Sequence, residues 1–176
     1  GEIINKIKKK ELQGINVTTP YKQNVIPFLD LVINSAKETS SVNTIYLNNE
    51  NKIVGENTDV YGFDCSFIKK LKEKDLLEKN ILILGAGGVT SSVIYALTKR
   101  SIKKIFISNR TIKKAENIKR KFPFIEIVLW ENINKKSEDV DVIINTTSLG
   151  TTNGNNFNQV INKFKADMVY YDVVYN

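Results

Sequence analysis

The sequence predicts an α/β protein in which a small, partial α/β lobe precedes a doubly wound parallel sheet. Two observations support this fold class. Short apolar runs alternate with stretches of helical periodicity through the second half of the chain, and a glycine-rich turn at 85–90 (GAGGVT) connects the first of these runs to a helical stretch. Such alternation is typical of βαβ units, whose crossovers place helices on both faces of a parallel sheet.

The elements of the first lobe follow from local patterns. Residues 2–12 have helical periodicity, and a proline-containing turn at 19–22 is predicted to open a helix that runs to about Leu29. Strand-like runs are found at 14–17, 41–47 and 52–57, and the last two form a predicted pair around Asn48 to Asn51. Residues 59–74 then form an amphipathic helix that leads to the second lobe.

The second lobe is predicted to contain five strands. These are residues 81–85, 105–108, 125–130, 141–145 and 168–174. We therefore expect three regions: a partial first lobe at 1–58, a connecting helix and linker at 59–78, and a sheet domain at 79–176 that is incomplete at its C-terminal end. Both ends are expected to be cut, because the first helix has no capping residue before it and the last strand-like run ends the chain.

The glycine-rich turn has the layout of a dinucleotide site in a Rossmann-type sheet. Gly85 allows a tight turn, Gly87 lets the backbone approach a pyrophosphate, and the N–H groups that open the following helix attract an anion. Glycines also end strands for purely conformational reasons, so a structural turn is the alternative interpretation. The preceding buried-type strand and the following amphipathic helix favour nucleotide binding.

The end of the second strand in this domain indicates which nucleotide is bound. A site that prefers NAD usually has an acidic residue there for the ribose 2′-OH, whereas this chain has Asn109, Arg110 and Thr111, followed by Lys114. Arg110 can contact a 2′-phosphate and Lys114 can add a second positive charge, which predicts NADP(H). The alternative is an ordinary helix start with solvated cations.

Composition excludes several kinds of site. The chain has 26 basic and 19 acidic residues, but the lysines are dispersed and not interleaved with aromatic residues, so we expect no nucleic-acid partner. The absence of histidine excludes His-dependent proton transfer and His-ligated metal sites within this span, and we expect no metal. A lone cysteine, Cys65, and the lack of a long apolar span suggest a cytoplasmic protein with no membrane contact.

Three polar clusters in the first lobe point to chemistry. They are NVTTPYK at 16–22, SVNT at 41–44 and ENTD at 56–59, and each ends or interrupts a strand-like run. We expect these clusters to converge on a cleft between the lobes, where Lys22 would supply a cation and Asp59 the carboxylate that orients it. Helix capping by Thr18 or Thr19 and by Asp59 is the structural alternative.

Together these motifs resemble the shikimate dehydrogenase family. NVTTPYK, SVNT, NTDVYGF, GAGGVTSS, NRT, INTTSLG and YYDVVYN occur in the order of that family's signatures, over the middle of its usual length. The resemblance implies reversible NADPH-dependent reduction of 3-dehydroshikimate to shikimate in aromatic amino-acid (chorismate) biosynthesis. It implies a monomer or a homodimer. A quinate/shikimate dehydrogenase-like enzyme with an altered substrate and a non-catalytic NADP-binding regulatory module remain as alternatives.

The resemblance also assigns site residues. Lys22 matches the catalytic lysine and Asp59 its partner, and the substrate-contacting positions are Thr18, Asn43, Asp59 and Tyr175. The cofactor-binding positions are Gly85, Ala86, Gly87, Gly88, Val89, Asn109, Arg110, Thr111, Lys114 and Val173. Four residues depart from the usual pattern: Lys114 replaces an arginine, Val60 a glycine, Thr146 an alanine and Thr151 an apolar residue. Lys114 keeps a positive charge but loses bidentate geometry, and Val60 is expected to alter the backbone beside Asp59.

Overall fold

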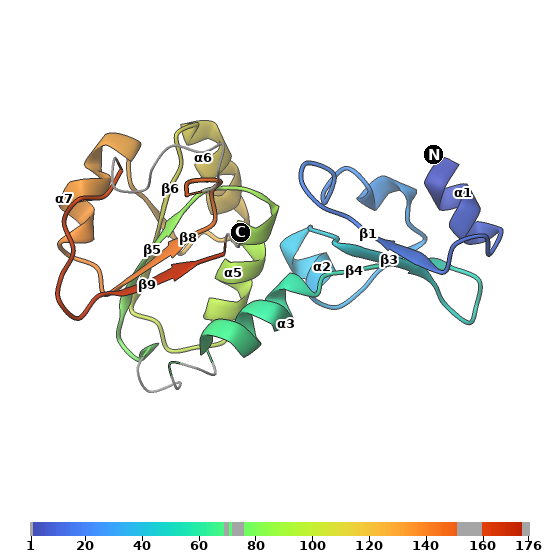
Figure 1. Cartoon of the computed structure of the whole chain (residues 1–176), viewed down its shortest axis with the longest axis horizontal. Helices are drawn as coiled ribbons and strands as arrows, with labels where there is room; N and C mark the ends of the chain where they lie inside the picture. Colours follow the sequence, from blue (N-terminus) through green and yellow to red (C-terminus); the bar gives the residue numbers. More distant parts are fainter. Residues whose placement is uncertain (1, 69–70, 72–75, 151–159, 174–176) are drawn as a thin grey trace.

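The computed structural model describes residues 2–68, 71, 76–150 and 160–173. Two lobes, each built on its own sheet, are joined by the helix α3 (Asp59–Phe63). In Figure 1 the first lobe lies on the side of the N-terminus, α3 bridges the two, and α5 (Gly88–Thr98) stands at the face of the second lobe that meets the first.

The first lobe contains a four-stranded sheet. Its strands are ordered β1-β3-β4-β2, with β1 (Gly14–Asn16), β3 (Thr44–Leu47), β4 (Ile53–Glu56) and β2 (Leu31–Val32). The predicted pair of short strands is confirmed, because β3 and β4 are antiparallel with Ile45 opposite Gly55. Helices α1 (Glu2–Lys8) and α2 (Ser35–Thr39) contribute Ile7 and Ala36 to a small core with Ile45 and Ile53.

The predicted helix between the proline-containing turn and Leu29 is wrong. This segment consists of turns followed by one short 3₁₀ helix, η1 (Ile26–Phe28), which contains Pro27. Proline lacks a backbone N–H and disfavours helical geometry in the residue before it, so a continuous α-helix through position 27 is not favoured. The chain turns instead, and the carbonyl oxygen of Lys22 accepts the N–H of Val42 at 2.8 Å.

The second lobe contains the predicted parallel sheet. Its order is β7-β6-β5-β8-β9, formed by β7 (Glu126–Ile127), β6 (Lys104–Ser108), β5 (Asn80–Leu84), β8 (Val142–Asn145) and β9 (Val169–Asp172). Every neighbouring pair is parallel. The order reverses at β5, and in doubly wound sheets the crevice at the carboxyl ends of the strands beside this reversal is where ligands bind.

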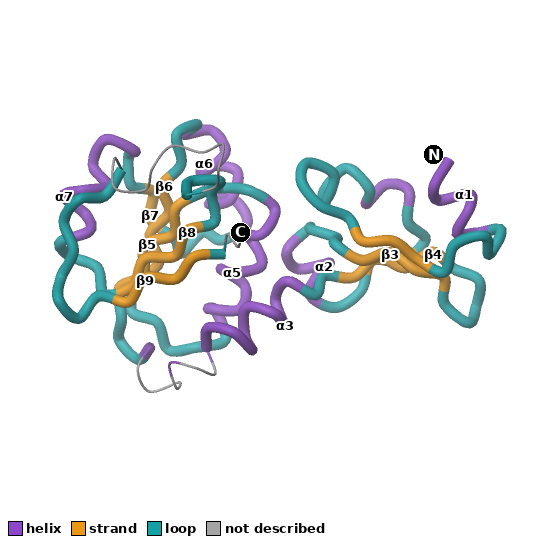
Figure 2. Tube along the Cα trace, viewed as in Figure 1, coloured by secondary structure: helices purple, strands orange, loops and turns teal. Residues whose placement is uncertain are grey.

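Helices cover both faces of this sheet, which confirms the doubly wound fold (Figure 2). Ile81 and Ile83 of β5 point into a core shared with α5 and α6 (Ile112–Lys121), and Leu82 and Leu84 point into a second core with α7 (Ile133–Ser137). This alternation follows from the two-residue period of a strand that is buried on both faces.

One predicted strand of the second lobe is shorter than expected. The strand expected at 125–130 ends at Ile127, because β6 pairs with it only at Phe106 and Ile107, and the 3₁₀ helix η4 (Trp130–Asn132) follows. In the connecting segment, the helix expected at 59–74 begins with α3, continues as a π-helical turn, η2 (Asp64–Ile68), and is helical again at Leu71, while residues 69–70 and 72–75 of the expected helix lie outside the described residues. No helix in the described part of the chain is long and apolar enough to cross a membrane.

Candidate active site

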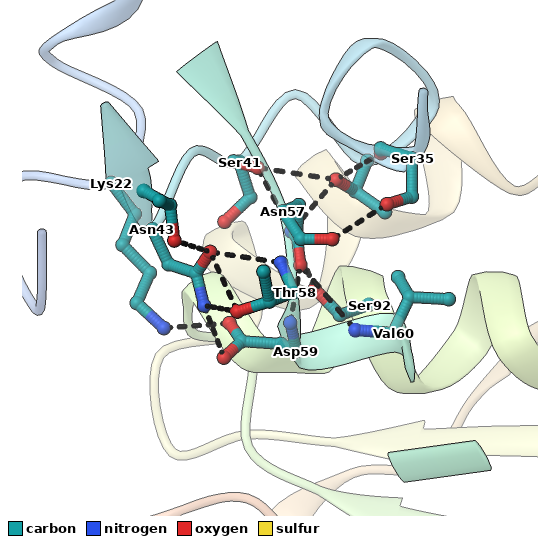
Figure 3. Close-up of polar contacts among 11 residues, drawn as sticks. Lys22, Ser35, Ser41, Asn43, Asn57, Thr58, Asp59, Val60 and Ser92 are labelled. Carbon is teal, nitrogen blue, oxygen red and sulfur yellow. Dashed lines mark hydrogen bonds and ion pairs between the residues drawn. The ribbon is translucent and has the colours of Figure 1, made fainter. Parts of the chain in front are cut away.

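Lys22 and Asp59 lie in direct contact although 37 positions separate them in the chain. The Lys22 Nζ atom lies 2.7 Å from Asp59 Oδ2, and the two side chains are 14% and 21% exposed. Lys22 lies in the turn that follows β1, and Asp59 is the first residue of α3. Figure 3 shows the two side chains pointing toward each other from these separate segments. A partly exposed ion pair of this kind can reach a ligand while remaining oriented.

Asn43 engages the other carboxylate oxygen. Its Nδ2 donates to Asp59 Oδ1 at 2.8 Å, and its Oδ1 accepts the backbone N–H of Thr58 at 2.9 Å. The backbone N–H can only donate, so this contact fixes which end of the amide faces Asp59. Both carboxylate oxygens of Asp59 therefore have a defined donor, and three residues from three segments converge at one point (Figure 3).

The capping interpretations of these residues are not supported. Thr58, not Asp59, occupies the position before α3, and the Asp59 backbone N–H donates to Asn57 Oδ1 at 2.9 Å. No helix follows Pro20 for Thr18 or Thr19 to cap, and Thr18 is exposed just beyond the end of β1. The sequence argument missed Asn57, because its contacts depend on how distant segments pack.

Gly85 has a backbone conformation that glycine adopts far more readily than other residues. Its φ is +109°, and a Cβ at this position would lie 2.5 Å from Thr146 Oγ1. A side chain here would therefore meet both backbone strain and a close contact. Gly87 differs, because a Cβ added there would meet no protein atom within 4 Å. The space beside Gly87 is open for a ligand group to approach the backbone.

A chain of hydrogen bonds connects the glycine-rich turn to the end of β5. The Gly87 N–H donates to Thr90 Oγ1 at 3.0 Å, Thr90 Oγ1 lies 2.8 Å from Thr146 Oγ1, and the Thr146 hydroxyl donates to the Leu84 carbonyl oxygen at 2.7 Å. The last bond uses the only hydroxyl hydrogen of Thr146, so the Thr90 hydroxyl donates to Thr146. Thr146, which departs from the resembled pattern, thus ties the turn to β5.

Two cavities adjoin this turn. One, of about 200 Å³, is lined by Gly85, Ala86, Gly87, Asn109, Arg110, Lys114, Trp130, Thr146, Thr147, Ser148 and Leu149. None of these described lining residues is acidic, and two are cationic, which fits a phosphate-bearing adenosine. Trp130 was expected as the last residue of a strand, yet it is the first residue of η4 and lines this cavity together with Arg110.

The second cavity, of about 330 Å³, spans the two lobes. Thr19, Pro20, Lys22 and Gln23 line one side, and Ala86, Gly87, Gly88, Lys114, Asn117 and Ile118 line the other. The lobes are close here, since a Cβ on Gly88 would lie 3.1 Å from Lys22 Cδ. The aliphatic part of Lys22 therefore lies against the turn that opens α5, and a ligand held by the turn would lie beside the Lys22–Asp59 pair.

The remaining expected residues lie around these cavities. Asn109 Nδ2 donates to the Thr111 carbonyl oxygen at 2.9 Å, Thr111 occupies the position before α6, and Arg110 is exposed. Val89 and Val173 are partly buried against the core on the α5 face of the sheet. Tyr175 lies outside the described residues. Among the described residues no cluster of acidic, cysteine or histidine side chains could hold a metal ion.

Two family descriptions and the curated relatives agree on what the sequence is similar to. Residues 67–173 match the family described as shikimate / quinate 5-dehydrogenase, and residues 1–45 match the shikimate dehydrogenase substrate binding domain. The chain is 45% identical to the shikimate dehydrogenase (NADP(+)) of Pelagibacter ubique over 99% of its own length and 63% of that protein.

Solved structures agree with this match. The chain superposes on shikimate dehydrogenase from Aquifex aeolicus with a TM-score of 0.84 at 39% identity, covering 99% of this chain and 63% of that one. Quinate dehydrogenase from Corynebacterium glutamicum in complex with NAD gives a TM-score of 0.84 at 26% identity, covering the same shares, 99% and 63%. The chain thus spans less than two thirds of the length of the relatives it matches. From these matches and the geometry above, the chain belongs to the shikimate / quinate 5-dehydrogenase family.

Proposed function

We propose that the protein is an NADP-dependent shikimate dehydrogenase that reversibly reduces 3-dehydroshikimate to shikimate in aromatic amino-acid biosynthesis. One observation carries the proposal. The Lys22–Asp59 pair and the glycine-rich turn line or adjoin a single cavity between the lobes, so a proton donor and a dinucleotide site face one another. The curated relative from Pelagibacter ubique carries the same activity in its name.

The residues around the turn fit NADP(H). When bound, the nicotinamide supplies a hydride from C4 to a ketone carbon or takes one from an alcohol. The pyrophosphate would be held by the turn and the start of α5, at Gly85, Ala86, Gly87, Gly88 and Val89. The adenosine 2′-phosphate would be held by Asn109, Arg110, Thr111 and Lys114. Val173 would line the nicotinamide side. The Gly87 N–H already donates to Thr90, so the open space at Gly87 serves close approach and not an extra hydrogen bond.

Proton transfer is the task of Lys22. In the reductive direction the Lys22 ammonium, directly or through a water molecule, protonates the alkoxide oxygen that forms as the ketone carbon is reduced. Asp59 accepts from Lys22 on one carboxylate oxygen and from Asn43 on the other, so the lysine keeps one orientation while its charge changes. Thr18, Asn43, Asp59 and Tyr175 are the proposed substrate contacts. A polyhydroxylated ring requires hydrogen-bonding side chains of this kind.

Steady-state kinetics of the full-length gene product test this assignment. We expect NADPH oxidation with 3-dehydroshikimate, and a fall in kcat of about 10²- to 10⁴-fold in Lys22→Ala, the range typical of a lost general acid. Lys10→Ala, an exposed lysine in the first lobe, serves as the matched control and should keep wild-type rates. No turnover by the wild type, or normal turnover by Lys22→Ala, would contradict the mechanism. Faster oxidation of quinate than of shikimate would reassign the substrate within the same family.

Nucleotide binding can be measured separately from catalysis. Trp130 is the only tryptophan of this chain and lines the cavity with Arg110, so NADP⁺ binding should quench its fluorescence. The difference between the wild type and Trp130→Phe isolates this signal in the full-length protein. Binding without turnover would favour the regulatory-module alternative. We further propose a cytoplasmic protein that is a monomer or a homodimer, which light scattering can distinguish.

A further inference from the structure

Asn57 is a buried amide at the junction of the two lobes. Its residue is 3% exposed, and its side chain makes hydrogen bonds with both lobes and with the start of α3. Figure 3 shows it between Ser41 and Ser92, with Asp59 directly below. A buried amide with every polar atom engaged holds its neighbours in one arrangement, because any shift leaves a buried group without a partner.

The amide oxygen sets the beginning of α3. Asn57 Oδ1 accepts the backbone N–H of Asp59 at 2.9 Å and lies 3.4 Å from the Val60 nitrogen. These N–H groups belong to the first helical turn, which has no carbonyl oxygen within the helix to accept them. Asn57 therefore fixes the backbone from which the Asp59 carboxylate reaches Lys22 and Asn43.

The amide nitrogen reaches the opposite side of the junction. Asn57 Nδ2 donates to the Ser41 carbonyl oxygen at 2.8 Å and to Ser92 Oγ at 2.9 Å, with Thr39 Oγ1 at 3.1 Å. Ser92 is a buried residue of α5, one helical turn from the glycine-rich turn at its start. One side chain thus connects the first lobe, the Asp59 backbone and the helix that opens at the nucleotide site.

We propose that Asn57 is a positioning residue, which holds the Lys22–Asp59 pair at a fixed place relative to α5 and so aligns proton transfer with hydride transfer. This inference rests on the function proposed above. The contacts place Asn57 on neither cavity lining, so it acts through Asp59 and Ser92 and not by touching the substrate or the nucleotide. Its loss should slow the chemical step while leaving nucleotide affinity nearly unchanged.

Three substitutions in the full-length protein test this role. Asn57→Asp keeps the acceptor for the Asp59 N–H but removes the two N–H donors of the side-chain amide. Ser92→Ala removes only the hydrogen bond to α5. Ser35→Ala is the matched control. Ser35 Oγ donates to the Asn57 backbone carbonyl oxygen at 2.8 Å, so its loss perturbs the same residue without touching its amide. Each variant is assayed for kcat, for KM of both substrates, for NADP⁺ affinity by Trp130 quenching and for thermal stability.

We expect kcat to fall by about 10- to 100-fold in Asn57→Asp, since a displacement near 1 Å can cost about 10²-fold in rate. NADP⁺ affinity should change little, and the solvent deuterium isotope effect on kcat should rise because proton transfer becomes limiting. Ser35→Ala should lose stability and keep kcat. A purely structural role for Asn57 would instead lower stability without raising the isotope effect.

Two results would overturn the inference: an unchanged kcat in folded Asn57→Asp, or an equal loss in Ser35→Ala. If Asn57→Asp does not fold, Ser92→Ala decides, and a wild-type kcat in that variant refutes the coupling to α5. Failure of the proposed function is seen separately, because it would leave the wild type itself without 3-dehydroshikimate reduction.

Discussion

Two glycines of the same turn should respond to alanine in opposite ways. Gly85 has a φ of +109° and faces Thr146, whereas Gly87 has a φ of −92° and no protein atom within 4 Å of an added Cβ. We expect Gly85→Ala to destabilise the fold. We expect Gly87→Ala to fold normally and to bind NADP⁺ weakly, because the methyl group would occupy the space that the pyrophosphate approaches.

The cost of Gly85→Ala has two parts. A non-glycine residue in a sparsely populated positive-φ region costs about 1–3 kcal/mol. The added Cβ would also lie 2.5 Å from Thr146 Oγ1 and 3.1 Å from the Thr146 carbonyl carbon, and overpacking of this kind costs about 1–3 kcal/mol. The free energy of unfolding should therefore fall by roughly 2–6 kcal/mol, a large share of the typical 5–15 kcal/mol of a domain.

Urea denaturation and Trp130 quenching separate the two effects. With a typical m-value of about 2 kcal/mol/M, Gly85→Ala should lower the midpoint by roughly 1–3 M, and Gly87→Ala should change it little. The double variant Gly85→Ala, Thr146→Ala removes the hydroxyl contact but not the backbone strain. It should recover part of the loss, as coupled neighbouring sites do.

The reasoning fails if Gly85→Ala has the wild-type midpoint, because neither the strain nor the contact would then exist. It also fails if Gly87→Ala binds NADP⁺ as tightly as the wild type. In that case the open space beside Gly87 is not the approach to the pyrophosphate, and the nucleotide must lie elsewhere.

Three further substitutions probe charge. Arg110→Asp should weaken NADP⁺ binding more than NAD⁺ binding, because a carboxylate would meet the 2′-phosphate; equal weakening in the quenching titration would remove the argument for NADP. Asn145→Asp should place a carboxylate beside Asp172, whose oxygens now accept from Asn145 Nδ2 at 3.1 and 3.2 Å. Repulsion between the two carboxylates raises the pKa of one of them in the folded state. The loss in free energy of unfolding relative to the wild type should therefore grow as pH rises from 5 to 8, and a loss that does not depend on pH would contradict this prediction. The hydrogen bond from Lys104 lowers the pKa of Glu126 in the folded state. The pair therefore stabilises the fold at pH values above the unfolded pKa of about 4.3, and this contribution is lost on acidification. Glu126→Gln should make the free energy of unfolding less dependent on pH in this acidic range.

Local patterns were sufficient to predict the second sheet. Its central strands are buried on both faces and are continuous apolar runs, and the helical stretches between them identify the βαβ alternation. The helix expected to follow the turn at 19–22 does not form, because Pro27 lies inside the segment that it would occupy. The strand at 125–130 was overextended for a different reason. Its length depends on how much of β6 is available for pairing, which the strand's own residues do not encode.

The candidate site was predictable only in part. The polar residues at strand ends pointed to Lys22 and Asp59, but helix capping by Thr18 or Thr19 and by Asp59 was an open alternative, which the fold does not support. Asn57 lay within one of these clusters and still was not recognised. Its amide nitrogen donates to Ser41 and Ser92, which are distant in sequence, and no local pattern links an asparagine to a serine 35 residues away.

Val60 shows how the second lobe stabilises the geometry of the first. The resembled family commonly has glycine at this position, and a backbone change beside Asp59 was expected. The structure places Val60 in α3, where a β-branched residue is allowed, and buries it to 6% exposure in the core that contains Ile81, Val93 and Phe63. Burial of a valine side chain stabilises by roughly 1.5–3 kcal/mol, which a glycine would not provide. Because Asp59 directly precedes Val60, packing of Val60 in the second lobe fixes the position of Asp59, the residue that orients Lys22.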